Sequence, residues 1–138
     1  MIVLFTDFGL AGPYTGQMKA VLAREAPGVP VIDLFADAPQ RDPQRAAYLL
    51  AAYAPWFPPG TAFLAVVDPG VGGTRVPLVA NADGRVFVGP DNGLFAIVLR
   101  RAAAAEVREI QALRPPFWVR SVSAGPELLF RGFPRAGI

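Results

Sequence analysis

The sequence contains neither cysteine nor histidine among its 138 residues. The lack of cysteine excludes disulfide bonds, thiolate-bound zinc and a cysteine nucleophile. The lack of histidine excludes a Ser-His-Asp triad and any histidine-ligated metal within this chain. We therefore expect no metal site in it.

Charge and long apolar runs are also scarce. Charged residues make up 17% of the chain, and 13 basic against 11 acidic residues leave a net charge of +2. This charge is too small and too scattered to predict a nucleic-acid interface. No uninterrupted apolar stretch of about 18 residues predicts a membrane span, and the N-terminus lacks the basic leader of a signal peptide. The sequence thus predicts a cytoplasmic protein with neither a nucleic-acid nor a membrane partner.

The chain does contain enough apolar residues for one folded domain, because they make up 53% of it. Short apolar runs predict buried strands, and apolar residues at helical spacing between these runs predict helices. The predicted strands lie at residues 2–5, 31–35 and 62–67, and the predicted helices at 14–26 and 43–54. In the second helix, Asp42 is the expected N-cap ahead of Pro43. This alternation predicts a Rossmann-like, mainly parallel α/β sheet with helices on both faces.

The pattern changes after the third strand. Two short apolar runs, at 76–80 and 85–88, flank an Asp83-Gly84 pair, which predicts a β-hairpin. A helix at 92–101 and a strand at 107–110 follow.

From residue 115 onward the sequence shows no period. We therefore expect an N-terminal α/β domain over residues 1–114 and an irregular tail over residues 115–138.

Three aspartates, Asp7, Asp68 and Asp91, follow predicted strands directly or within a few residues. Asp7 and Asp68 end runs predicted to be parallel strands, and the carboxyl ends of such strands line the edge where α/β sheets bind ligands. Each aspartate can instead simply cap a turn, which this residue type favours. The glycines match neither G-x-G-x-x-G nor a Walker sequence, so a phosphate-free nucleoside is the compatible ligand.

Asp68 and Arg75 flank a tight glycine-rich loop, which lets the two charges meet. One interpretation is an ion pair that braces the turn. The other is a site in which an ionised Asp68 holds a water molecule and accepts its proton.

Several motifs over about residues 1–100 occur in one order that resembles the S-adenosyl-L-methionine (SAM) hydroxide adenosyltransferases, relatives of the SAM-dependent fluorinase and chlorinase. The motifs are Thr6-Asp7-Phe8-Gly9, Met18-Lys19, Val31-Ile32-Asp33, Pro58-Pro59-Gly60-Thr61, Ala65-Val66-Val67-Asp68-Pro69-Gly70-Val71-Gly72, Arg75 and Gly89-Pro90-Asp91-Asn92-Gly93-Leu94.

The resemblance implies hydrolysis of SAM to adenosine and L-methionine, by attack of water on the ribose C5′ carbon. It implies SAM as the substrate, no cofactor, and a homotrimer that binds SAM between the N-terminal domain of one subunit and the C-terminal domain of the next. It implies that Asp68 and Arg75 are catalytic and that Asp7 hydrogen-bonds the ribose hydroxyls. The other residues that it places in the substrate site are Phe8, Gly9, Asp91 and Asn92.

Two features favour water over a halide as the nucleophile. The halogenase branch has a tyrosine where this chain has Asp68, and the fluorinase carries a long insertion where this chain has a short hairpin. A carboxylate beside the nucleophile also repels chloride or fluoride.

The chain departs from the family in its last part. The family's catalytic histidine lies in a T-F-H-G-R-D stretch that should follow residues 121–123, where this chain has Ala124-Gly125-Pro126-Glu127. The family's C-terminal β-barrel-like domain also has no counterpart here. We expect a truncation or frameshift near Ser123.

Upstream, other positions differ from the family as well. Ala36, Arg41 and Gly12 stand where the family has a second histidine, an aromatic residue and an acidic residue. The hypotheses are then an impaired SAM hydrolase, a non-catalytic SAM- or adenosine-binding domain, or an inactive fragment. A SAM-dependent halogenase is the less favoured alternative, because Asp68 and the short hairpin argue against it.

Overall fold

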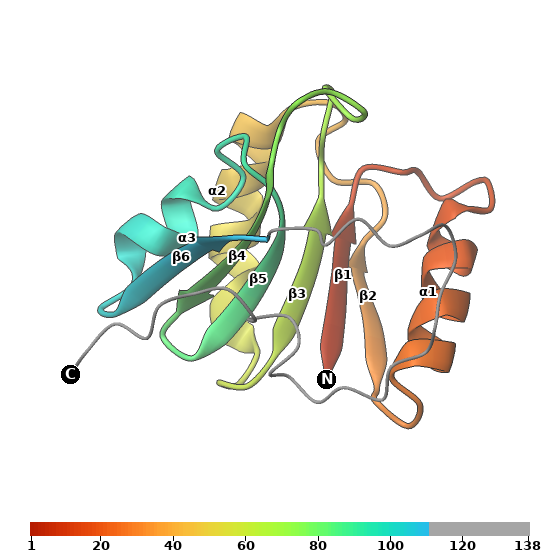
Figure 1. Ribbon diagram of the computed structural model, residues 1–138, viewed down its shortest axis with the longest axis horizontal. Helices are drawn as coiled ribbons and strands as arrows, with labels where there is room; N and C mark the ends of the chain where they lie inside the picture. Colours follow the sequence, from red (N-terminus) through yellow and green to blue (C-terminus); the bar gives the residue numbers. More distant parts are fainter. Residues whose placement is uncertain (111–138) are drawn as a thin grey trace.

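The computed structural model describes residues 1–110. Strands and helices alternate over the first part of this chain, and three consecutive strands then precede the last helix and the last strand, as Figure 1 shows. The strands are β1 (Ile2–Thr6), β2 (Val31–Phe35), β3 (Ala62–Val66), β4 (Pro77–Ala82), β5 (Arg85–Pro90) and β6 (Ala105–Glu109). The helices are α1 (Tyr14–Glu25), α2 (Pro43–Tyr53), the short 3₁₀ helix η1 (Ala54–Trp56) and α3 (Ala96–Arg101).

The strands form one six-stranded sheet in the order β2-β1-β3-β5-β4-β6 (Figure 1). β1 pairs in parallel with β2 and β3, and β3 pairs in parallel with β5. β4 pairs antiparallel with β5 and β6. The prediction of a mainly parallel α/β sheet is confirmed.

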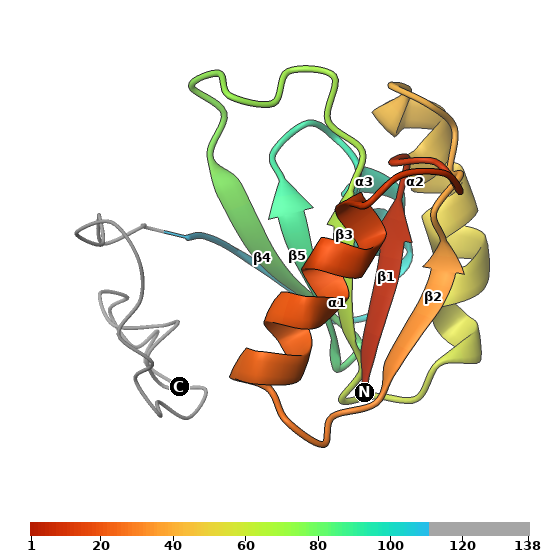
Figure 2. The same cartoon turned by 90° about the vertical axis from the view of Figure 1, so that its right-hand side faces the viewer.

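Helices cover both faces of the sheet, as predicted. Val3 and Phe5 of β1 pack in one apolar core with residues of α2 and α3. Leu4 is paired with Asp33 of β2 and therefore points to the opposite face, where Lys19 of α1 forms an ion pair with Asp33. Figure 2 shows α1 and α2 on opposite sides of the strands.

The main core lies between the sheet and the α2–α3 layer. Phe63 and Phe87 stack with ring centroids 4.8 Å apart, and Phe95 contacts Phe87 at 5.8 Å. All three side chains are almost fully buried. Burial of each ring contributes about 1.5–3 kcal/mol, so these aromatic residues fix β3 and β5 against the N-terminal side of α3.

Helix α1 is far less buried than α2. Its sequence forms the expected helix, but none of its residues is fully buried. Tyr14 and Val21 are 63% and 47% exposed. The apolar spacing therefore predicted the helix correctly, although Tyr14 and Val21 on it remain exposed.

The predicted hairpin and helix cap are both present. β4 and β5 are joined by Asp83 and Gly84, which both have positive φ angles (50° and 79°), as a two-residue hairpin turn requires. Asp42 caps α2, since its Oδ1 accepts the Arg45 N–H at 2.9 Å. Pro43 occupies the first helical position.

The predicted helix at 92–101 is wrong at its beginning, because α3 starts at Ala96. Gly93 has a φ of 88°, which no right-handed helix accommodates. The last strand covers Ala105–Glu109 instead of 107–110. The predicted boundary at residue 114, the tail over 115–138 and the break near Ser123 lie outside the described residues.

Candidate functional site

The order of the strands creates a switch point between β1 and β3. From β1 the chain passes to β2 on one side, and β3 then lies on the other side of β1. In open α/β sheets ligands bind at such a point, outside the carboxyl ends of the strands. Asp7 directly follows β1, and Asp68 follows β3 by two residues. The two carboxylates predicted from the sequence therefore flank the switch point.

Asp68 and Arg75 form the ion pair that the loop spacing predicted. The Arg75 guanidinium donates from Nη1 to Asp68 Oδ1, and the Gly70 N–H donates to the same oxygen at 3.0 Å. The two side chains are 12% (Asp68) and 32% (Arg75) exposed. Solvent screens a partly buried pair less than a surface pair, so this contact orients Asp68 even though its contribution to stability is small.

Asp68 Oδ2 accepts no hydrogen bond from the described residues. A carboxylate held through one oxygen in this way keeps its other oxygen for a ligand or a water molecule.

Gly70 makes room for the Arg75 guanidinium. A Cβ atom at this position would lie 2.9 Å from Arg75 Nη2 and 3.1 Å from Nη1. The Gly73 N–H donates to the Gly70 carbonyl at 3.1 Å and closes the loop. A glycine at position 70 is thus needed for Arg75 to turn back onto Asp68.

Asp7 is held by a residue from a different loop. Its Oδ2 accepts the backbone N–H of Arg41 at 2.8 Å. The Asp7 N–H donates to the Val66 carbonyl at 3.4 Å, which places it beside the end of β3. Oδ1 accepts no hydrogen bond from the described residues, so it is available to a polyhydroxyl ligand such as a ribose.

Phe8 and Gly9 form the turn that follows Asp7. The Gly9 N–H donates to the Ala36 carbonyl at 2.6 Å, which ties this turn to the end of β2. The Phe8 ring lies against Tyr14, with centroids 5.9 Å apart. Both residues are half-buried at the same edge of the sheet as Asp7, and their contact with substrate stays a prediction.

Asp91 lies with Arg75 in a single hollow of about 480 Å³. The Asp91 N–H donates to the Val76 carbonyl at 3.0 Å, which holds the residue at the far side of the loop. The other residues that line this hollow are Gly70, Gly73, Thr74 and Val76. Arg75 thus shares this hollow with Asp91 and pairs with Asp68, which does not itself line the hollow. Asp7 follows the neighbouring strand β1.

Asn92 is engaged inside the protein. Its Nδ2 donates to the Val67 carbonyl at 2.7 Å, and its Oδ1 accepts the Leu94 N–H at 3.2 Å. Its side-chain amide therefore connects the ends of β3 and β5. The sequence predicted a role in substrate binding for Asn92 but not this connection.

Three contributors to this edge were not predictable from the residue pattern. Arg41 acts through its backbone N–H, which any residue except proline offers. Thr74 and Val76 line the hollow because of the path of the loop. The sequence contains no signal for the Arg41 contact. In the structure, Arg41 stands out by its positive φ of 55°.

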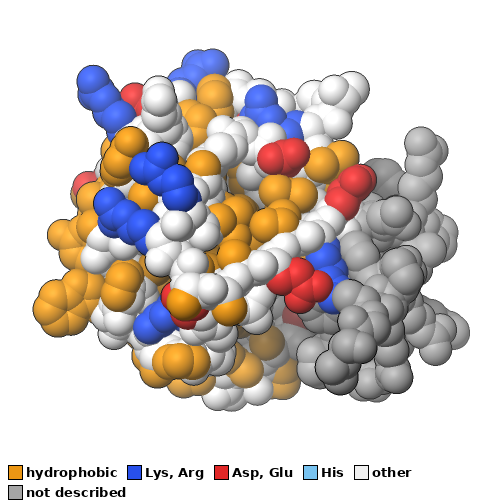
Figure 3. All heavy atoms as spheres, turned by 90° about the vertical axis from the view of Figure 1, so that its left-hand side faces the viewer, with side chains coloured by type: hydrophobic (Ala, Val, Ile, Leu, Met, Phe, Trp, Pro, Cys, Tyr) orange, Lys and Arg blue, Asp and Glu red, His pale blue; other side chains and the backbone are white. Residues whose placement is uncertain are grey.

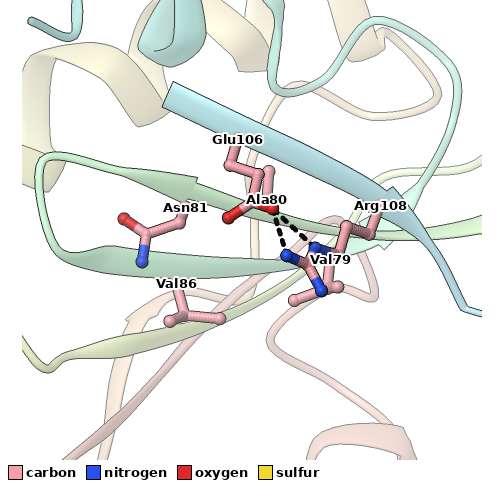
Figure 4. A pocket seen from close by; sticks show the side chains of 6 residues that line it. All are labelled: Val79, Ala80, Asn81, Val86, Glu106 and Arg108. Atoms are coloured by element: carbon pink, nitrogen blue, oxygen red, sulfur yellow. Dashed lines mark hydrogen bonds and ion pairs between the residues drawn. The ribbon is translucent and has the colours of Figure 1, made fainter. Parts of the chain in front are cut away.

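A second hollow, of about 280 Å³, lies on the face of β4, β5 and β6 (Figure 4). Among the described residues, its charged groups are Glu106 and Arg108, and Arg108 Nε donates to Glu106 Oε1 at 2.7 Å. No aspartate of the candidate site borders it, so we do not assign it to the same function.

The described residues on the outer side near β6 carry charges of both signs (Figure 3). Figure 3 shows hydrophobic side chains gathered along the middle of this side, with acidic and basic side chains interspersed around them. Within residues 1–110, no group of three or more acidic side chains is placed to hold a metal ion. Nor does any helix of this part of the chain have the length and apolar character needed to cross a bilayer.

The comparisons with known protein sequences agree on one family. Residues 2–127 match the family described as SAM hydroxide adenosyltransferase N-terminal domain. The chain is 50% identical over 97 residues to an (R)-S-adenosyl-L-methionine hydrolase of Thermus thermophilus, which covers 70% of this chain and 37% of that protein. It is 34% identical over 119 residues to the protein of the same name from Methanocaldococcus jannaschii, covering 83% of this chain and 45% of that one.

Solved structures agree with the sequence matches. An uncharacterized conserved protein from Thermotoga maritima aligns with a TM-score of 0.77 and 38% identity, over 80% of this chain and 43% of that one. A conserved hypothetical protein from Thermus thermophilus aligns with a TM-score of 0.69 and 43% identity, over 80% of this chain and 46% of that one. The chain spans less than half the length of each of these four proteins. In both sequence and fold, the chain belongs to the SAM hydroxide adenosyltransferase family, through that family's N-terminal domain.

Proposed function

We propose that the chain binds SAM at the carboxyl ends of β1, β3 and β5, as part of an enzyme that hydrolyses SAM to adenosine and L-methionine. The observation that carries the proposal is the placement of Asp7 and Asp68 on either side of the switch point. The names of the curated relatives, (R)-S-adenosyl-L-methionine hydrolases, support the same substrate and reaction.

Each site residue has a proposed role. Asp7 accepts hydrogen bonds from the ribose hydroxyls through Oδ1. Phe8 and Gly9 shape the wall beside the ribose. Asp91 places a negative charge at the hollow, which complements the positive charges of SAM.

Asp68 and Arg75 are the proposed catalytic pair. Oδ2 of Asp68 orients a water molecule, whose oxygen attacks C5′ opposite the sulfur. The C5′–S bond breaks, its electron pair stays on sulfur as the neutral thioether of methionine, and the proton of the water passes to Asp68 and then to solvent. Arg75 holds the Asp68 carboxylate in its orientation through their ion pair.

The family resemblance extends the proposal to the assembled protein. We propose a cytoplasmic homotrimer that uses SAM as substrate and needs no cofactor. SAM would then lie between subunits, and this chain would supply the ribose-binding and water-activating side.

One observation favours a second candidate, a domain that binds SAM or adenosine without turning SAM over. The 138 residues contain no histidine, whereas the resemblance places one in the catalytic set. We therefore expect weak or absent turnover by this chain alone, and binding is the decisive measurement.

The test combines calorimetry with product analysis. We expect saturable heat on titration with SAM, and a lower affinity in Asp7→Asn. The same samples are incubated with SAM, with and without excess chloride, and analysed by mass spectrometry. Adenosine plus methionine supports hydrolysis, SAM binding without products supports the second candidate, and a chlorinated adenosine would show a halogenase. No heat with either SAM or adenosine would overturn both candidates.

A further inference from the structure

Asn92 uses both ends of its side-chain amide within the protein. Nδ2 donates to the Val67 carbonyl at 2.7 Å, and Oδ1 accepts the Leu94 N–H at 3.2 Å. Asparagine can make further hydrogen bonds, but both the amide nitrogen and the amide oxygen of Asn92 are already bonded to backbone groups. The residue is half-buried and does not line the hollow that Arg75 and Asp91 share.

The carbonyl that Asn92 holds belongs to the peptide unit that leads into Asp68. A peptide bond is planar, so fixing the Val67 oxygen also fixes the plane that contains the nitrogen and Cα of Asp68. Val67 itself is fully buried. Asn92 therefore restrains the Asp68 backbone from the β5 side.

The carboxylate of Asp68 is restrained independently from the other side. The Gly70 N–H and Arg75 Nη1 both bind Oδ1. The loop thus determines where the carboxylate points, and Asn92 determines the orientation of the backbone from which it projects.

Asn92 is itself well anchored. Its N–H donates to the Pro90 carbonyl at 3.0 Å, and the next two residues with side chains, Leu94 and Phe95, are almost fully buried. Because the Asn92 amide is itself held in place, it can restrain the Val67 carbonyl. A mobile side chain would instead move together with the Asp68 backbone.

We propose that Asn92 is a positioning residue for Asp68, acting through the Val67 carbonyl, and not a principal substrate contact. The proposal rests on the function proposed for Asp68, but its structural part does not require turnover.

Asn92→Asp is the most specific variant, because it removes only the hydrogen-bond donor. The aspartate keeps an acceptor for the Leu94 N–H but replaces the donor with an oxygen that repels the Val67 carbonyl. Asn92→Ala removes both bonds. Asn81→Ala is the matched control, because Asn81 also holds a turn through its side chain, accepting the Gly84 N–H at 3.0 Å in the distant hairpin.

The first measurement is amide hydrogen exchange of Gly70, whose N–H is bound to Asp68 Oδ1. We expect Asn92→Asp and Asn92→Ala to accelerate Gly70 exchange by about 10-fold or more, with the β1–β3 ladder amides unchanged. Asn81→Ala should leave Gly70 unaffected. Unchanged Gly70 exchange, or equal acceleration across the whole sheet, would overturn the proposal.

Kinetics or binding in the same samples separates this inference from the proposed function. Where SAM is turned over, Asn92→Asp should lower kcat about 10- to 100-fold with little change in KM. A raised KM with unchanged kcat would instead mark Asn92 as a substrate contact and overturn the proposal. If the unchanged chain neither binds nor hydrolyses SAM, the proposed function fails, and Gly70 exchange still decides whether Asn92 positions Asp68.

Discussion

Arg75 and the Gly70 N–H converge on a single oxygen of Asp68, Oδ1. This relationship makes the two oxygens of one carboxylate unequal: Oδ1 is bound by the loop, whereas Oδ2 accepts no hydrogen bond from the described residues. A water molecule bound at Oδ2 would meet an acceptor whose orientation is already fixed, which lowers the entropy lost in reaching the reactive geometry.

Gly70→Ala tests this arrangement. The new Cβ would lie 2.9 Å from Arg75 Nη2, so the flexible guanidinium should move away and the Asp68–Arg75 pair should break. Because the pair is partly exposed, we expect the free energy of unfolding to fall by only about 1 kcal/mol or less. Urea denaturation measures that loss, and a crystal structure of the variant shows the displaced Arg75.

Arg75→Met provides the control for this prediction. In its background the guanidinium is already gone, so Gly70→Ala should then have almost no further effect on stability. An equal effect of Gly70→Ala in both backgrounds would mean that the glycine serves the loop backbone and not Arg75.

Asp7→Asn should weaken SAM binding and leave the fold intact. The asparagine keeps an oxygen that can accept the Arg41 N–H, but it loses the negative charge offered to the ribose hydroxyls. Since hydrogen bonds to charged groups contribute about 1.5–3 kcal/mol, affinity should fall about 10-fold or more. Glu109→Gln makes the same change of charge at β6 and should bind SAM normally in calorimetry; equal loss in both variants would point to a general charge effect.

Much of the fold was predictable because local patterns and tertiary packing agree. The apolar runs became β1, β2 and β3, and Asp42 became the cap of α2. The Asp68–Arg75 contact was also predictable, since a seven-residue spacing across a glycine-rich loop brings two charges together.

The remaining features depend on contacts between distant segments. Asn92 bonds Val67, 25 residues earlier, and this contact together with the conformation of Gly93 delays the start of α3. Arg41 reaches Asp7 across 34 residues through its backbone N–H. Neither contact leaves a mark on the local sequence pattern. The pattern therefore placed the start of the helix too early and did not predict the contact between Arg41 and Asp7.

Gly89→Ala should be strongly destabilising. A Cβ at this position would lie 2.1 Å from the Ala65 carbonyl oxygen and 2.9 Å from Phe95 Cζ. The first of these is backbone of the paired strand β3, so relief requires separating β3 from β5. We expect unfolding free energy to fall by about 3 kcal/mol or more, measured by urea denaturation.

Gly16→Ala is the matched substitution with the opposite expectation. Gly16 lies inside α1, and outside the helix's own backbone no atom of residues 1–110 lies within 4 Å of a new Cβ. Alanine should therefore stabilise the helix by about 0.5–1 kcal/mol. Destabilisation by Gly16→Ala, similar to that at Gly89, would show that α1 is covered on this side.

Asp42 offers a separate test of how α2 is held beneath the site. Its Oδ1 accepts the Arg45 N–H at 2.9 Å, and its Oδ2 lies 3.4 Å from Arg45 Nε. Asp42→Ala removes the cap and should lower unfolding free energy by about 1 kcal/mol. Asp42→Asn keeps the capping oxygen and loses only an exposed ion pair, so it should lie within about 0.5 kcal/mol of the unchanged protein. Equal destabilisation by the two variants in urea denaturation would assign the effect to the ion pair and the helix dipole, whereas the expected difference assigns it to the backbone hydrogen bond.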